Sequence, residues 1–454
     1  MITGIPTEKI EKGKQMNIVI MLAMAIFTIG TFTIDSFLYS YQVERLYLIS
    51  TTVLFIFAYM QTKSGINIYR IDLMWFMFFT YFMLNMAYQG KFKMLYVMDI
   101  LAFAFVFIFL LLAKIEAKYI KKSLTIMYLI SIIYAFSSLF QYWFMDIYSR
   151  FILPMFSSSQ IDEILRIYAR GSYSGFTWQT AFISGYIVFG LGIVFFTYKN
   201  VKNKVLRLIM LASIPLLFLS LFMAGKRSHL VFMFVALIIT LLFSTELKKF
   251  FGQFIRITFG IILGLIILIL IMTTVSFDED SQIGKVVNRL TGTIEGFIAG
   301  EDVTSGRVIL YDFAFELFNE NPIFGVGWRT YSESSIGVLN ADRASHPHNI
   351  YIQLLTELGI IGFLLFLIPV CYTFVKTIKL LLGYSKFFGG NLQWKMLIQF
   401  SLYIQTFFLI YGLTGNLLTD RLYLFMYVFA VSITFSAIKY SIKPKRKLKK
   451  DEVF

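Results

Sequence analysis

The sequence predicts an all-α polytopic membrane protein with about twelve transmembrane helices. Two observations predict this fold class. Of the 454 residues, 58% are hydrophobic and only 15% are charged, and apolar stretches recur at about 20 residues, the length that a helix needs to cross a bilayer. No polar stretch between them is long enough to build a core of its own. We therefore expect residues 1–454 to form a single membrane-embedded domain.

The predicted spans begin directly after a polar N-terminal segment. No small-residue cleavage site follows the first span, which indicates an uncleaved helix rather than a signal peptide. The spans lie near residues 17–34, 46–60, 71–88, 94–113, 123–144, 176–197, 208–224, 229–244, 257–275, 350–375, 396–413 and 421–438. A large loop separates the ninth span from the tenth.

The distribution of charge predicts the orientation of these spans. The net charge of +15 comes from lysines and arginines in short clusters between apolar stretches, which is typical of membrane topology and not of a nucleic-acid-binding protein. With a cytoplasmic N-terminus, the cytoplasmic connections carry most of the 41 basic residues, so both termini are expected inside. The largest outer segments are about 145–175 and 276–349. Acidic residues outnumber basic ones in the second, where we expect the function to lie.

Several classes of site are excluded by the residues available. The chain has one cysteine, Cys371, so an intrachain disulfide is impossible, and its three histidines make a zinc site unexpected. There is no phosphate-binding loop, no dinucleotide-binding fingerprint and no serine nucleophile elbow. We expect neither a cofactor nor a metal ion.

The stretch SHPHNIYIQLLTELGIIG, residues 345–362, places two histidines in front of a hydrophobic helix. Ser345 or His346 can cap this helix, and Pro347 suits its first position. His348 then lies in the first turn, where the helix dipole disfavours an imidazolium and free backbone N–H groups attract an anion. A neutral base beside an anion site is one interpretation. A capping histidine at the membrane interface is the other.

A polar stripe runs down the same helix. It consists of Asn349, Gln353 and Glu357, four residues apart in an otherwise apolar helix. Gly359 and Gly362 follow and permit close helix packing. The stripe either contributes to a substrate site or is buried against neighbouring helices, and the spacing alone does not choose between the two.

A second candidate segment, residues 301–331, is EDVTSGRVILYDFAFELFNENPIFGVGWRTY. Thr304 or Ser305 is expected to cap a helix that runs to residue 319 and stops before a proline. The helix is expected to be amphipathic and to lie on the outer surface. Its apolar stripe comprises Ile309, Phe313 and Leu317.

Arg307 opens that helix, where a cation is unfavourable for the helix dipole. A phosphate would compensate it; the alternative is a salt-bridged arginine or one that extends to the lipid headgroups. The following loop, GVGWRTY, contains Trp328 and Arg329. The tryptophan suits an interface anchor better than a platform for a sugar ring.

Two short outer turns also carry ionisable residues. MAGKRSHL, residues 223–230, holds Lys226 and Arg227 against the membrane on the side where positive charge is disfavoured. They are suited either to gripping a diphosphate or to binding headgroups. In GLTGNLLTDRLY, residues 412–423, Asp420 either pairs with Arg421 or orients a catalytic group.

These pieces, in this order, resemble the O-antigen ligase/polymerase superfamily of bacterial envelope proteins. Its most specific signature is a His followed by Asn, Ser or Gln, nine residues, Gly, two residues and Gly, Thr or Tyr. His348, Asn349, Gly359 and Gly362 match it completely. NPIFGVGWRTY is similar to the family's NPxxGxGxxxF element, TSGRVILYDFAFEL to the helix before it, and AGKRSHL to its SRG turn, with Lys226 in place of the usual Ser. The similarity covers roughly residues 205–370.

The resemblance implies a GT-C-like, metal-independent glycosyltransferase that uses a lipid-diphosphate-linked glycan as donor. It implies that Arg227 and Arg307 bind undecaprenyl diphosphate and that His348 deprotonates the acceptor hydroxyl, with inversion at the anomeric carbon. Asp420 matches a family acidic residue only loosely. The predicted substrate-binding residues are Lys226, Asn349, Gln353, Glu357, Trp328, Arg329 and Asp420.

Polymerases of this superfamily join lipid-linked repeat units, and ligases pass the glycan to lipid A-core or to protein. The Lys-, Ile- and Phe-rich composition favours a capsular or exopolysaccharide polymerase. A flippase is the alternative from another class, but no internal repeat is visible and the notable charges lie at the outer ends of spans. Expected partners are the lipid-linked oligosaccharide, membrane lipids, a chain-length regulator and a flippase, and no nucleic acid. The loop at 145–175 could complete the acceptor site. We expect the protein in the bacterial cytoplasmic membrane.

Overall fold

The computed structural model describes residues 68–88, 117–244, 307–338 and 346–442, together with the single residues 53, 252, 255 and 284. Within these ranges the chain is helical and contains no strand, which confirms the predicted all-α class. The predicted spans near 17–34, 94–113 and 257–275, and all of 46–60 except residue 53, lie outside the described residues. The count of twelve spans therefore stays a prediction.

Long helices occupy the positions of the other predicted spans. They are α3 (Arg70–Tyr88), α5 (Ala117–Trp143), α8 (Thr180–Thr197), α9 (Lys204–Met223), α10 (Arg227–Ser244), α15 (Ile350–Leu382), α17 (Leu392–Tyr411) and α18 (Arg421–Ile442). Within the described part of the chain, six helices are long and apolar enough to cross a membrane. They run over Tyr119–Trp143, Thr180–Asn200, Lys204–Met223, Arg227–Ser244, Ile350–Leu382 and Arg421–Ser441. The protein is therefore an integral membrane protein.

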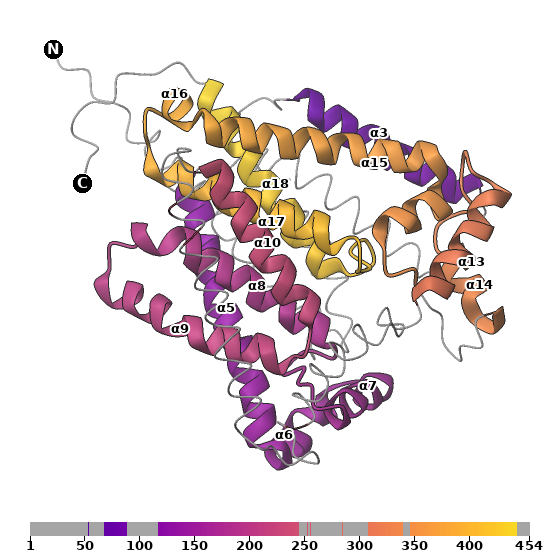
Figure 1. Cartoon of the computed structure of the whole chain (residues 1–454), viewed down its shortest axis with the longest axis horizontal. Coiled ribbons are helices and arrows are strands. Elements are labelled where there is room, and N and C mark those ends of the chain that lie inside the picture. Colours follow the sequence, from indigo (N-terminus) through magenta and orange to yellow (C-terminus); the bar gives the residue numbers. More distant parts are fainter. Residues whose placement is uncertain are drawn as a thin grey trace.

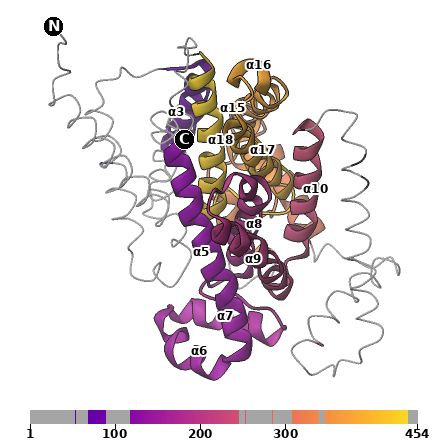
Figure 2. The ribbon, with the colours of Figure 1, turned by 90° about the vertical axis from the view of Figure 1, so that its left-hand side faces the viewer.

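The burial of these helices separates the centre of the bundle from its lipid-facing side. The apolar windows of α8 and α18 are 89% buried, whereas those of α9 and α10 are only 28% buried although they are as apolar. A helix that exposes so much apolar surface is stable only where lipid surrounds it. Figure 2 shows α8 and α18 within the bundle and α10 at its margin.

Polar side chains join the central helices in the bundle interior. Gln405 Nε2 donates to Thr377 Oγ1 of α15 and to Ser401 Oγ of its own helix α17, each at 2.9 Å. Thr434 of α18 lies 2.8 Å from Thr377 and 2.9 Å from Ser401, measured between hydroxyl oxygens. Hydrogen bonds of this kind hold transmembrane helices in register, since the apolar surroundings offer no competing water.

The shorter helices lie between the long ones in the order of the chain. They are α6 (Met145–Phe151), η2 (Leu153–Met155), α7 (Ser158–Ala169), η3 (Tyr198–Asn200), α13 (Arg307–Glu320), α14 (Thr330–Val338) and α16 (Tyr384–Phe388). Helices α6 and α7 form a small unit beyond the end of α5 (Figure 2). It is tied to the bundle because Tyr148 Oη donates to the carbonyl of Gly175 at 2.6 Å and Gln141 Oε1 accepts from the Gly175 N–H at 2.8 Å.

The alternation of helix directions gathers the candidate segments at one end of the bundle. The end of α9 and the start of α10 lie there, with the start of α15, the end of α17 and the start of α18. The peptide N–H of Ile350 donates to the carbonyl of Gly412 at 2.9 Å, which joins the start of α15 to the turn after α17. Figure 1 shows α13 and α14 beside the N-terminal end of α15.

Helix α13 differs in part from the predicted amphipathic helix. It ends at Glu320, close to the expected position, but its buried residues are Phe313, Ala314 and Leu317. Of the predicted apolar stripe, Phe313 and Leu317 are buried in the protein, whereas Ile309 is 62% exposed. The helix packs on α15 through the turn around Ala314, whose carbonyl accepts from Thr356 Oγ1 at 3.1 Å, and this contact selects the buried face. The expected caps Thr304 and Ser305 lie outside the described residues.

Helix α15 is interrupted where close helix packing was predicted. Gly359 has φ 67° and ψ −174°, which is not a helical conformation. The loop of residues 322–327 fills the interruption: the N–H groups of Val326 and Gly327 donate to the carbonyls of Thr356 and Glu357, both at 3.0 Å. In the other direction, the N–H groups of residues 360 and 361 donate to the carbonyls of residues 322 and 323 at 2.9 and 3.3 Å. The loop thus replaces the hydrogen bonds that the break removes.

Helix α3 packs against the junction between the loop of residues 322–327 and the break in α15. Tyr81 Oη donates to the carbonyl of Leu358 and Asn85 Nδ2 to that of Phe324, each at 2.8 Å. Gly362 lies against Tyr81, whose ring would collide with a Cβ there, so the predicted close packing holds for this glycine. Gly359 instead contacts the backbone of residue 323, where a Cβ has no room.

The junction predicts an unequal cost for adding a methyl group at two glycines with nearly equal φ. Gly359→Ala must adopt φ +67° and collide with the loop backbone, whereas Gly389→Ala pays only for φ +62°, since nothing lies within 4 Å. We expect a loss of about 2–5 kcal/mol at Gly359 and about 1 kcal/mol at Gly389. Thermal unfolding in detergent measures both, and equal losses would contradict the backbone docking.

Candidate active site

His348 lies just before α15, not in its first turn. The N-cap is Asn349, whose side-chain oxygen accepts from the N–H groups of Tyr351 and Ile352 at 2.9 and 3.2 Å. The prediction that Ser345 or His346 caps a helix starting at Pro347 was therefore wrong. An asparagine with extended backbone satisfies two of the free N–H groups of the helix, so helical geometry begins only at Ile350.

His348 has a left-handed backbone. Its φ is 52°, and the only other non-glycine residue with positive φ in the described ranges is Arg329, at 61°. This conformation costs a residue with a Cβ about 1–2 kcal/mol. Both residues had been singled out from sequence, and strain of this kind concentrates at functional sites.

The surroundings of His348 keep its imidazole neutral. Burial above all, together with the positive charges of Arg307, His346 and Lys226, lowers its pKa from 6.5 to about 4. The predicted neutral state agrees with this value, but its main cause is burial and not the helix dipole. The charges of Arg307 of α13 and of Lys226 in the α9–α10 turn therefore both act on this ring.

The α9–α10 turn comprises only residues 224–226. Gly225 has φ 67°, which lets the chain reverse within three residues. Lys226 is partly buried in this turn, and Arg227 opens α10. Of these two, Lys226 is the residue whose charge acts on His348.

Asp420 lies at the end of the turn that follows α17. Burial raises its pKa to about 7, and the charge of Lys226 opposes this rise. A charge from a distant part of the sequence, that of Lys226, therefore acts on Asp420, which was not predicted. Whether Asp420 pairs with Arg421 or orients a catalytic group stays a prediction. Asp420 takes up a proton near neutral pH.

The side chain that contacts His348 was missed from sequence. Asn416 Nδ2 lies 3.1 Å from His348 Nδ1. Asn416 belongs to the same turn as Asp420, and the stretch GLTGNLLTDRLY was noted for its charges alone. Asparagine is so common in turns that only its position opposite His348 distinguishes it.

Two residues of the polar stripe, Gln353 and Glu357, are buried, and Asn349 is partly buried. Gln353 and Glu357 are each 1% exposed, and Gln353 Nε2 donates to Glu357 Oε2 at 3.1 Å. Burial, together with the nearby Glu357 charge, raises the pKa of Tyr331. The stripe thus lies between α15 and the α13–α14 unit, as the packing interpretation expects. A substrate-binding role for Gln353, Glu357 and the capping Asn349 stays a prediction.

Trp328 is fully buried, and its ring meets Phe82 of α3 edge to face with centroids 5.1 Å apart. The expected interface anchor does not match this position, because the GVGWRTY loop turns inward to dock on α15. Arg329, the next residue, is partly buried. A role for either side chain in substrate binding stays a prediction.

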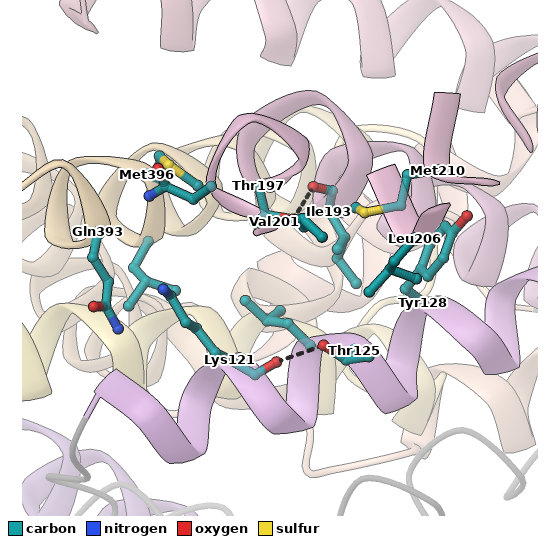
Figure 3. A pocket seen from close by; sticks show the side chains of 13 residues that line it. Lys121, Thr125, Tyr128, Ile193, Thr197, Val201, Leu206, Met210, Gln393 and Met396 are labelled. Carbon is teal, nitrogen blue, oxygen red and sulfur yellow. Dashed lines mark hydrogen bonds between the residues drawn. The ribbon is translucent and has the colours of Figure 1, made fainter. Parts of the chain in front are cut away.

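Two cavities in the described part of the chain lie at the opposite end of the bundle. One of about 200 Å³ is bounded by α5, α8, α9 and α17, with Lys121 among mostly apolar walls (Figure 3). A second, of about 390 Å³, lies near the last residues of α8 and α10 and the first residues of α17. Neither contains a predicted site residue, and their walls suit lipid better than sugar. Within the same described ranges, no group of three or more His, Cys, Asp or Glu side chains could hold a metal.

The segment that contains most of this site matches a known protein family. Residues 212–367 match the O-antigen ligase family. This match identifies residues 212–367 as a domain of the O-antigen ligase/polymerase superfamily. The matched range nearly coincides with the 205–370 on which the sequence resemblance rested and includes Lys226, Arg227, Arg307 and His348. No curated protein matches the chain.

The superfamily indicates a membrane glycosyltransferase-like enzyme of the ligase or polymerase type. The matched segment ends in α15, so Asn416 and Asp420 lie beyond it. The structure adds them to the site by folding the α17–α18 turn against the start of α15. Two turns and two helix starts that are far apart in sequence therefore converge on His348.

Removing a neighbouring positive charge should raise the pKa of His348. We expect Arg307→Gln and Lys226→Gln each to move it from about 4 toward 6.5, and Lys226→Gln to raise that of Asp420 above about 7 as well. NMR titration of ¹⁵N-histidine-labelled protein measures the first, and Arg150→Gln, on α6, serves as the control. An unchanged His348 pKa in both variants would show that neither Arg307 nor Lys226 acts on His348.

The same pKa predicts how stability depends on pH. Because the folded pKa lies below 6.5, the unfolded chain binds the proton first as the pH falls. His348 should therefore reduce stability progressively between about pH 6.5 and 4. Thermal unfolding across this range should show a smaller loss for His348→Gln than for the wild type, and parallel curves would contradict it.

Proposed function

We propose that the protein polymerises undecaprenyl-diphosphate-linked oligosaccharide repeat units into a surface polysaccharide. The observation that carries this proposal is the neutral imidazole of His348 close to the positive side chains of Arg307 and Lys226. A base and a cationic site side by side match a reaction in which a hydroxyl attacks and a diphosphate leaves.

The reaction would be an inverting glycosyl transfer without a metal. Nε2 of His348 would take the proton of the acceptor hydroxyl while its oxygen bonds to the anomeric carbon of the donor. The bond from that carbon to the diphosphate oxygen breaks, and its electron pair leaves with the diphosphate. A positioned general base contributes about 10²- to 10⁴-fold to such a step.

The basic side chains would stabilise the leaving group. Negative charge builds on the diphosphate as the glycosidic bond breaks, so cations placed there favour the transition state over the ground state. Arg307 and Arg227 can grip phosphate oxygens with two hydrogen bonds each, and Lys226 adds a third positive charge. Asp420, whose pKa burial raises to about 7, would limit the net positive charge around Lys226 when it is ionised.

The second candidate is a ligase that passes the glycan to lipid A-core or to protein. The description of the matching family, O-antigen ligase, favours it. Both reactions use the same donor and the same base, so the acceptor alone distinguishes them. The Lys-, Ile- and Phe-rich composition supports the polymerase.

The proposal also predicts on which side of the membrane the site and the termini lie. The site would lie at the outer face of the bacterial cytoplasmic membrane, with both termini in the cytoplasm, because the basic connections lie at the opposite ends of the helices. The lipid-linked donor would arrive from a flippase, and a chain-length regulator is a further expected partner. Capsule or exopolysaccharide is the expected product class.

The test uses purified full-length protein in nanodiscs, an undecaprenyl-diphosphate-linked repeat unit and a chelator. We expect a ladder of longer lipid-linked glycans on a gel, reduced about 10²- to 10⁴-fold by His348→Ala. His346→Gln is the matched control, because it removes a histidine only two residues away. This variant should keep most of the activity. Arg307→Lys should keep the charge but lose the paired hydrogen bonds, and so lower kcat.

Other outcomes distinguish the alternatives. Transfer that appears only after lipid A-core or protein is added would make the protein a ligase. Movement of lipid-linked units across the bilayer without a change in their length would make it a flippase. A full ladder from His348→Ala would leave the polymerase in place and overturn the assignment of the base.

A further inference from the structure

One ring nitrogen of His348, Nδ1, lies within hydrogen-bond distance of the side-chain amide of Asn416. Nδ1 lies 3.1 Å from Asn416 Nδ2, and Asn416 Oδ1 is buried with no hydrogen-bond partner among the described residues. No described residue is hydrogen-bonded to the other ring nitrogen, Nε2. The orientation of the Asn416 amide therefore decides which nitrogen carries the proton of the neutral ring.

The two amide orientations have opposite chemical consequences. If Nδ2 donates to Nδ1, the ring proton must lie on Nε2, and His348 offers the site a donor and no lone pair. If the amide is turned, Oδ1 accepts from Nδ1–H, and Nε2 presents the lone pair that a base requires. The two ends of an amide have almost the same shape, so both orientations fit the same space.

The charges around the ring favour the turned amide. The titratable groups that act on His348 are Arg307 from α13, His346 from its own segment and Lys226 from the α9–α10 turn, and all of them lower its pKa. A positive field attracts the oxygen end of the amide dipole and repels its N–H end. The carboxylate of Asp420 lies in the same turn as Asn416, and its charged neighbour is Lys226.

The backbone holds Asn416 in place independently of its side chain. Its carbonyl accepts from the Thr419 N–H at 3.0 Å, from Thr419 Oγ1 at 3.0 Å and from the Asp420 N–H at 2.9 Å. The adjacent Leu417 and Leu418 are buried. A change confined to the Asn416 side chain should therefore leave the turn folded, and its effects can be attributed to His348.

We propose that Asn416 is a positioning residue: its Oδ1 accepts from His348 Nδ1–H and holds the imidazole in the tautomer whose Nε2 is free. This inference rests on the proposed role of His348 as the base. When Nε2 takes the acceptor proton, the same oxygen stabilises the resulting imidazolium. The step needs no further group, because the proton then passes to water.

The direct test is the tautomer itself. The protein contains three histidines, so ¹⁵N-histidine labelling in nanodiscs gives three sets of ring signals, and His348→Gln assigns the one of interest. At pH 7.5 the ring is neutral, and we expect the Nδ1–H form in the wild type. Asn416→Leu should shift it toward the Nε2–H form that free histidine prefers. A wild-type Nε2–H form would overturn the inference.

Kinetics provide a second test with matched variants. Asn416→Leu should lower kcat about 10- to 100-fold with little change in KM. Asn416→Asp should restore much of the activity, and its added negative charge should raise the pKa of His348 and move the acidic limb of the pH profile upward. Thr419→Val removes a hydrogen bond to the same carbonyl without touching His348, and should leave kcat and the tautomer unchanged.

These outcomes separate the inference from the proposed function. If Asn416→Leu keeps the wild-type tautomer and the kcat of Thr419→Val, the positioning role is wrong even when the polymerase is correct. If the wild type forms no glycan product, the proposed function fails, and the NMR measurement still decides which nitrogen carries the proton.

Discussion

The docking of one loop on a broken helix holds the candidate site together. Residues 322–327 and the interruption of α15 at Gly359 exchange backbone hydrogen bonds in both directions. Inside a membrane protein such irregular backbone persists only where its polar groups are satisfied by protein, and here Tyr81 and Asn85 of α3 complete that requirement. Because α13 precedes the loop and His348 precedes α15, the junction also fixes Arg307 relative to His348. Two sequence elements that match the family separately are therefore one structural unit.

The site combines this rigid unit with two turns from the other half of the bundle. Lys226 comes from the turn before α10, and Asn416 and Asp420 come from the turn after α17. Burial and the positive groups keep His348 neutral, while the burial of Asp420 makes its charge depend on pH near neutrality. The same environment that lowers the proton affinity of the base would also attract a diphosphate. This arrangement fits a transferase that separates the roles of base and anion site among different helices.

The surroundings of α15 explain why its polar residues divide into two groups. Asn349 caps the helix, and Gln353 and Glu357 bond to each other beneath the α13–α14 unit. His348, one residue before the cap, adopts a left-handed backbone at φ 52°. A cap, a buried pair and a neutral base thus occupy less than three turns of chain, and their roles follow from what packs on each.

The sequence by itself determined the helical class and, within the described ranges, the positions of the long helices, because apolar length is a local property. Its short motifs also drew attention to His348, Arg307, Lys226 and Asp420. It also predicted a neutral His348, although for a different main reason. Only the tertiary structure decided the cap at Asn349, the break at Gly359, the outward position of Ile309 and the burial of Trp328. Apart from the cap, whose partners are local, each of these depends on a neighbour distant in the chain. Asn416 shows this most clearly: it lies 68 residues from His348 in sequence, and only the packing of the α17–α18 turn against α15 brings its amide to the ring.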